Sequence, residues 1–184
     1  MGASAPSDRG DPGDELVDVV DAEDRVVATV TRREMRARRL RHRAVFVVVN
    51  DRAGRLLVHR RSAGKDLWPG RWDVAVGGVV AAGESWDAAA RRELAEEIGV
   101  DAEPVPLSAG AYADDDVDLV ARCYRAVHDG PVRFVDGEVA EARWVGREEL
   151  TELLASAPFV PDSTTLLPPD VLFPFPGPGD TQVR

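Results

Sequence analysis

Hydrophobic positions along the chain alternate between short β-branched runs and longer amphipathic stretches. Ala44–Asn50 reads AVFVVVN, which is typical of a buried strand, and Asp51–Gly54 supplies a turn before the returning strand Arg55–Arg61. The same reasoning predicts strands at Val74–Val80, at Leu119–Val127, at Ala142–Val145, and at two short segments of Glu15–Val30 around a turn at Ala22–Asp24.

Ser85–Ile98 has the strongest helix signals in the chain. Ser85 is suited to the N-cap, Ala88–Ala90 are good helix formers, and Gly99 stands where a C-terminal glycine belongs. Shorter helices are predicted within Thr31–Arg43 and at Arg147–Ala155.

Strands and helices interleave without a regular βαβ alternation. This order favours an α/β fold in which a mixed sheet is sandwiched by helices, built from residues 15–160 as one domain. Residues 1–14 are small, polar and rich in Gly, Pro and Asp, so a flexible tail is expected there. Seven of the 13 prolines follow residue 157, so residues 161–184 are predicted to form an irregular, Pro-rich tail.

Charge and composition narrow the class of protein. The formal net charge of −10 over 184 residues argues against a general nucleic-acid binder, because a phosphate backbone would be repelled. No apolar run is long enough to span a membrane, no secretory signal is visible, and the single cysteine, Cys123, excludes a disulfide framework. A cytoplasmic location is the resulting expectation, and the arginines of Thr31–Arg43 are interpreted as a solvated helical face.

Three carboxylates share one face of the predicted helix. Glu93, Glu96 and Glu97 occupy positions i, i+3 and i+4, where like charges repel one another by roughly 0.2–0.5 kcal/mol per pair. A divalent cation removes this repulsion, and oxygen-only ligands favour Mg²⁺, Mn²⁺ or Ca²⁺ over zinc. By themselves, three glutamates are also compatible with a solvent-facing patch on an acidic protein.

The residues around this helix resemble the Nudix hydrolase signature, G-x5-E-x7-R-E-U-x-E-E-x-G-U with U aliphatic. All nine specified positions are matched, by Gly78, Glu84, Arg92, Glu93, Leu94, Glu96, Glu97, Gly99 and Val100. The resemblance implies a Nudix-type α/β/α sandwich with a mixed β-sheet, in which this segment binds a divalent metal.

The resemblance also implies roles for individual residues. Glu93, Glu96 and Glu97 would be metal ligands, assisted by a main-chain carbonyl at Gly77 or Gly78. Arg92 and Glu84 would pair to fix the helix relative to the preceding loop. A further ligand from a later loop would be Glu138, with Glu141 as second choice.

The activity implied is hydrolysis of a diphosphate bond in a nucleoside diphosphate linked to another group X, or in a similar small diphosphate. Mg²⁺ is the expected cofactor, with Mn²⁺ as a substitute, because cations must invert the local charge before water can attack phosphorus. The general base stays open between Glu97 and Glu96, with Glu138 as a third choice.

A second resemblance is to the isopentenyl-diphosphate-isomerase-like branch of the same family. It is carried by Leu40-Arg41-His42, Arg60-Arg61, Lys65-Asp66, Trp68-Pro69-Gly70 and Trp72-Asp73. Arg61 and Lys65 would then grip the diphosphate, with Arg60 beside them, and Trp68 would be core, pocket wall or aromatic platform.

Isomerase chemistry is one alternative function. It would need a cysteine at the position of Gly77 and histidines at those of Val79 and Met35, so that His42 is the only histidine left for this chemistry. The other alternative is a Nudix module that binds a nucleotide or diphosphate without turning it over. The loops Ser62–Arg71 and Ala109–Asp118 are expected to shape the pocket for X, and a homodimer is compatible with an enzyme of this size.

Overall fold

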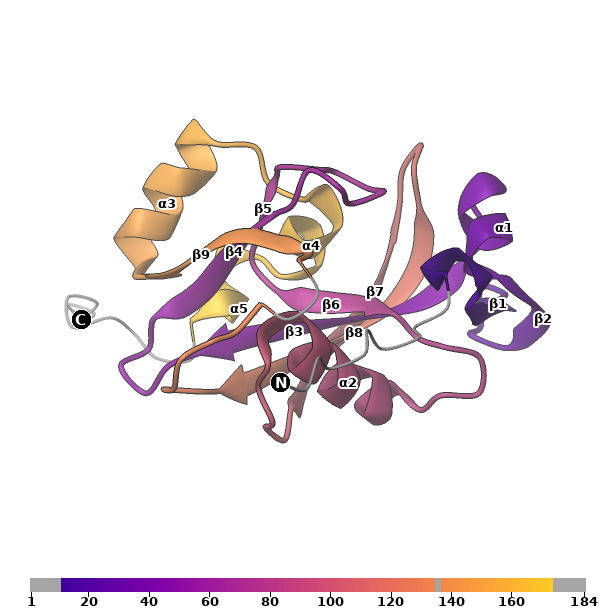
Figure 1. Ribbon diagram of the computed structural model, residues 1–184, viewed down its shortest axis with the longest axis horizontal. Coiled ribbons are helices and arrows are strands. Elements are labelled where there is room, and N and C mark those ends of the chain that lie inside the picture. Colours follow the sequence, from indigo (N-terminus) through magenta and orange to yellow (C-terminus); the bar gives the residue numbers. More distant parts are fainter. Residues whose placement is uncertain (1–10, 135–136, 174–184) are drawn as a thin grey trace, which may run out of the picture.

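A mixed β-sheet runs through the middle of the molecule and carries helices on both faces (Figure 1). The computed structural model describes residues 11–134 and 137–173. The strands are β1 (Leu16–Val20), β2 (Val26–Thr31), β3 (His42–Asn50), β4 (Leu56–Arg61), β5 (Trp72–Asp73), β6 (Val76–Val79), β7 (Val105–Ala113), β8 (Asp118–Val127) and β9 (Val139–Val145). The helices are the 3-10 turn η1 (Pro12–Asp14) and α1 (Arg32–Ala37), α2 (Trp86–Ile98), α3 (Arg147–Ser156), α4 (Pro161–Leu166) and α5 (Pro169–Leu172).

Strand β3 lies at the centre of the sheet. It pairs in parallel with β8 along its whole length and in antiparallel with β6, and it forms a hairpin with β4. Because side chains alternate across a strand, Val45, Val47 and Val49 pack towards α2, whereas Phe46 and Val48 pack towards the other helical layer. The expected α/β/α sandwich with a mixed sheet is therefore confirmed.

Helix α2 begins and ends at the predicted caps. The Ser85 hydroxyl accepts a hydrogen bond from the backbone N–H of Ala88 at 3.2 Å, and Gly99 adopts the left-handed conformation with φ of 65°. Ala90, Leu94 and Ile98 form the buried stripe that docks on the sheet. Glu93 and Glu97, on the neighbouring stripe of the helix, are buried too, and Glu93 lies against Gly78 of β6.

Two strand predictions need correction. Ala109–Asp118 was expected to be a loop, but its first half, up to Ala113, belongs to β7, which pairs with β8, and Asp118 begins β8. This edge strand is exposed along most of its length, so it lacks the alternation of buried and polar positions that indicates a strand. Of the strand predicted at Val74–Val80, only Val76–Val79 is a strand, β6, and Val74 and Ala75 separate it from β5.

The prediction of an irregular tail after residue 160 is wrong for the part that the structure describes. Prolines begin α4 and α5, at the first helical position where a missing N–H costs nothing. Leu167, Leu172 and Phe173 join the core under the sheet, so the folded domain continues to Phe173. Residues 1–10 and 174–184 of the two predicted tails lie outside the described residues.

None of the helices in the described ranges is long and apolar enough to cross a membrane.

Candidate active site

The signature segment leaves the sheet at β6, turns, and returns as α2. Gly77 and Gly78 pair with Phe46 and Val45 of the central strand. A Cβ atom on Gly77 would collide with the carbonyl group of Val45, and one on Gly78 would lie 2.5 Å from Oε1 of Glu93. Glycine at both positions therefore lets the Glu93 carboxylate lie directly against the backbone of the strand.

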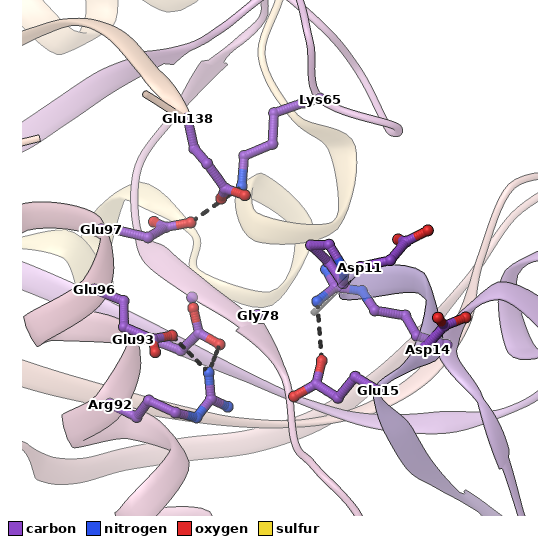
Figure 2. Close-up of a pocket in the computed structure, with 13 residues that line it drawn as sticks. Asp11, Asp14, Glu15, Lys65, Gly78, Arg92, Glu93, Glu96, Glu97 and Glu138 are labelled. Carbon is purple, nitrogen blue, oxygen red and sulfur yellow. Dashed lines mark hydrogen bonds and ion pairs between the residues drawn. The ribbon is translucent and has the colours of Figure 1, made fainter. Parts of the chain in front are cut away.

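Arg92 connects strand, loop and helix through one guanidinium group. Its Nε and Nη2 each donate to the Glu84 carboxylate at 3.0 Å, and Nη2 also donates to the Val79 carbonyl at 3.1 Å. Its Nη1 donates to Glu93 at 2.7 Å and to Glu96 at 3.1 Å (Figure 2). The structure thus contains the expected pair between Arg92 and Glu84, and this pair fixes α2 relative to the loop before it.

Glu97 is the most buried carboxylate of the cluster, with 3% of its surface exposed. Its Oε1 accepts a hydrogen bond from Nζ of Lys65 at 3.3 Å, and the same ammonium group is bonded to Glu138 (Figure 2). Its Oε2 is buried and has no hydrogen-bond partner among the described residues. Burial raises the pKa of Glu97 to about 8, an effect opposed by Lys65 and reinforced by Glu93 and Glu138.

Burial also raises the pKa of Glu93, while the Arg92 guanidinium works in the opposite direction. Two carboxyl groups on adjacent turns of one helix are therefore held in surroundings that disfavour their charge. Nearby cations are needed to keep both ionised.

A cavity of about 730 Å³ brings most of the predicted site residues together. The predicted residues on its wall are Lys65, Gly77, Gly78, Arg92, Glu93, Glu96, Glu97 and Glu138. The opposite wall was not predicted and comes from the N-terminal segment, with Asp11, Pro12, Asp14, Glu15 and Arg32. In the sequence, Asp11, Pro12 and Asp14 were interpreted as part of a tail and Arg32 as part of a solvated face, so nothing indicated that they form one wall.

The donor set suits a hard divalent cation. Every candidate ligand offers oxygen, and Glu97 Oε2 is a buried oxygen left without a partner in the described chain. As the side chains stand, Arg92 holds Glu93 and Glu96, and Lys65 holds Glu97 and Glu138. Within the described ranges, no three His, Cys, Asp or Glu side chains are already arranged around a common metal position.

The remaining predicted residues are divided between the site and the surface. Arg61 donates from Nε to the Leu67 carbonyl at 3.1 Å and, like Trp68, lines a small cavity of about 70 Å³ beside the carboxylates. Arg60 is exposed and pairs with Glu141 at 3.4 Å, and neither residue lines the cavity of the carboxylates. The structure therefore brings Arg61 and Trp68 near the site and leaves Arg60 and Glu141 outside it.

The positions that isomerase chemistry would use are occupied by core residues. Met35 and Val79 pack together with Val17 in a separate buried cluster. His42 is buried, with Nδ1 2.9 Å from the Leu40 carbonyl, and burial lowers its pKa to about 4.

Comparisons with known proteins agree with this geometry. The family model of the NUDIX domain matches residues 40–167. The chain is 39% identical over 154 residues to the uncharacterized Nudix hydrolase YfcD of Escherichia coli, covering 83% of this chain and 84% of that one. A crystal structure of DR0079 from Deinococcus radiodurans superimposes with a TM-score of 0.72 at 28% identity, covering 83% and 96% of the two chains. The NUDIX domain of Shewanella oneidensis NrtR, crystallised with ADP ribose, has the same fold, with a TM-score of 0.58 at 20% identity over 77% and 97% of the chains.

The chain belongs to the Nudix family and is a hydrolase whose family acts on diphosphate-containing compounds.

Proposed function

We propose that the enzyme hydrolyses the diphosphate bond of a nucleoside diphosphate linked to another group X, or of a similar small diphosphate, with Mg²⁺ as cofactor. The observation that carries this proposal is the convergence of Glu93, Glu96, Glu97 and Glu138 on one cavity. The ADP ribose bound by the NrtR domain, which shares the fold, is a compound of this chemical class.

Glu93, Glu96 and Glu97 would hold the cation, with Glu138 and the backbone carbonyl of Gly77 or Gly78 beside them. The divalent cation supplies charge neutralisation at the phosphates and acidifies water. The unpartnered Oε2 of Glu97 is available either to a cation or to the proton of an attacking water molecule, which supports Glu97 over Glu96 as the general base. Arg92 would keep Glu93 and Glu96 in place.

Lys65 and Arg61 would contact the phosphates of the substrate. Lys65 already reaches two carboxylates of the cluster, so it lies where a phosphate bound to the cluster would be. The short stretches shared with the isopentenyl-diphosphate-isomerase-like branch support this placement and the assignment to that branch.

The resemblance to that branch does not extend to isomerase chemistry. Its cysteine position is Gly77, where the backbone of Val45 leaves no room for any side chain. A binding module without catalysis is the other alternative, and the complete set of signature glutamates, of which Glu93 and Glu97 are buried, favours the enzyme.

The test is a turnover assay on a panel of nucleotide sugars, dinucleotides, nucleoside triphosphates and isoprenoid diphosphates, with Mg²⁺, Mn²⁺ or chelator. We expect metal-dependent release of a phosphate-containing product from at least one class. Metal-independent release, or an isomerised product with the diphosphate intact, would overturn the proposal. A cytoplasmic location and a homodimer remain predictions, for which cell fractionation and light scattering are the measurements.

A further inference from the structure

A second cavity, of about 470 Å³, adjoins the carboxylate cavity. Five cationic side chains line it, together with three carboxylates: Arg32, Arg33, Arg36, Arg61 and Lys65, and Asp11, Asp66 and Glu138. Arg32 and Arg36 reach it from α1, where a spacing of four residues puts them on one face, and Arg61 reaches it from the end of β4. Arg32 and Lys65 line both cavities, so the two spaces are immediate neighbours. We call Arg32, Arg36 and Arg61 the arginine cluster.

The solvated face expected for the arginines of Thr31–Arg43 is found only in part. Arg33 and Arg38 are exposed and paired, Arg33 with Asp11 and Asp14 and Arg38 with Glu34. Arg36 is instead half-buried and turned towards the cavity.

The cations around this cavity are unevenly neutralised. Arg32 has one ion pair, with Glu15 at 3.3 Å, and Arg61 approaches Asp73 only to 3.9 Å. Unlike the other two arginines, Arg36 has no ion pair or hydrogen bond from its side chain to any described residue.

The surroundings of Arg36 disfavour its charge. Burial, and next the charge of Arg32, lower the pKa of Arg36 to about 10, with a smaller contribution from Arg61 and with Asp66 and Asp162 acting in the opposite direction. A guanidinium group held in such surroundings gains more from an incoming anion than an exposed one does, because the attraction is less screened. Arginine forms bidentate hydrogen bonds with phosphate, so phosphate oxygens fit three converging guanidinium groups.

We infer that the arginine cluster binds the terminal phosphate of the substrate. This inference rests on the proposed function. A terminal phosphate is close to a dianion at neutral pH, whereas a phosphate esterified on both sides carries a single charge. Arg36 has no ion pair to a described residue, and the ion pairs of Arg32 and Arg61 are long, at 3.3 and 3.9 Å, so the three guanidinium groups match the dianion better than the single charge. The enzyme therefore favours diphosphates that end in a free phosphate over those with both ends esterified.

The first test measures binding of inorganic pyrophosphate to the full chain in the presence of chelator, by calorimetry. We expect Arg36→Gln to weaken this binding about tenfold or more, and Arg36→Lys to weaken it less, because one charged donor remains. Arg38→Gln is the matched control, since Arg38 lies on the same helix, is exposed, and does not line the cavity. Unchanged binding in a folded Arg36→Gln protein would overturn the inference.

The second test compares kcat/KM for ADP and for ADP-ribose with Mg²⁺. We expect Arg36→Gln to lower the value for ADP at least tenfold more than the value for ADP-ribose. An equal loss on both substrates would contradict the assignment to a terminal phosphate. If no substrate is turned over while pyrophosphate binding still depends on Arg36, the proposed function fails and the anion site stands.

Discussion

Glu97 shows how one residue can combine burial, an unsatisfied oxygen and a single cationic neighbour. Its carboxyl group lies at 3% exposure, with Lys65 on one oxygen and no described partner on the other. Such a group destabilises the fold unless a ligand binds it, because a buried polar atom without a hydrogen bond lowers the free energy of unfolding by about 1–3 kcal/mol. Its presence therefore indicates selection for a site rather than for stability.

We expect Glu97→Gln to lower kcat at least ~10²-fold without unfolding the protein, because the amide retains the shape but not the charge or basicity. Steady-state kinetics with the substrate identified in the panel is the measurement. Glu152→Gln, on the exposed side of α3, is the matched control and should keep normal turnover. Near-normal kcat in a folded Glu97→Gln protein would remove Glu97 from the proposed site.

The sequence predicted the relative positions of site residues wherever these residues lie close together in the chain. Glu84, Arg92, Glu93, Glu96 and Glu97 lie within one loop and one helix, so their mutual positions follow from helical geometry. The partners that come from distant segments followed only from the family resemblance, as for Lys65 and Glu138, or were missed. Arg36 and the N-terminal acids had no spacing that distinguishes a cavity wall from a solvated face.

Helix α2 is the element whose ends decide where the carboxylates lie. Its C-terminus is closed by Gly99, whose N–H donates to the carbonyl group of Ala95 at 3.1 Å while its φ is positive. Ser85 and Gly99 were both read correctly because capping is a local property of the chain. Edge strand β7 was missed because its exposed pairing with β8 leaves no burial pattern in the sequence.

Gly99→Ala tests this C-cap. We expect a loss of about 1 kcal/mol in the free energy of unfolding, because a residue with a Cβ atom is strained in the left-handed region. Urea denaturation is the measurement. Gly64→Ala is the control, since it has no positive φ and ample space, and should be nearly neutral. Equal effects of the two substitutions would show that the positive φ does not limit stability.

At the scale of the whole molecule, the C-terminal segment completes the layer opposite α2. Helix α4 brings Asp162 into the interior near Asp73, and both carboxyl groups are at most 5% exposed. Burial, and next the charge of Asp73, raise the pKa of Asp162 to about 7. The proline-rich sequence gave no sign of this packing, because burial there depends on contacts with residues more than a hundred positions earlier, as in the bond from Asn50 to the Leu172 carbonyl.

A raised pKa predicts a definite pH dependence. Between about pH 4 and pH 7 the folded state retains a proton on Asp162 that the unfolded state has lost, so stability falls as the pH rises through this window. We expect Asp162→Asn to be more stable than the original protein at pH 8, by about 2 kcal/mol, and to lose this advantage towards pH 4.

Urea denaturation of the metal-free protein at several pH values is the measurement. Asp170→Asn is the control, because Asp170 is exposed on neighbouring α5. An Asp162→Asn difference that stays constant from pH 4 to pH 8 would contradict the prediction.

The ammonium group of Lys65 lies between Glu97 and Glu138 and so affects the stability of the metal-free protein. Because Lys65 already neutralises part of the carboxylate charge, the fold does not depend on a bound metal ion for this. A chelator is therefore expected to abolish turnover while leaving the melting temperature nearly unchanged. On the proposed function, a divalent cation that took these carboxylates would replace the Lys65 ammonium group, whose charge would then be free to face the phosphates of the substrate. Binding of the cation and release of Lys65 towards the substrate would therefore take place together.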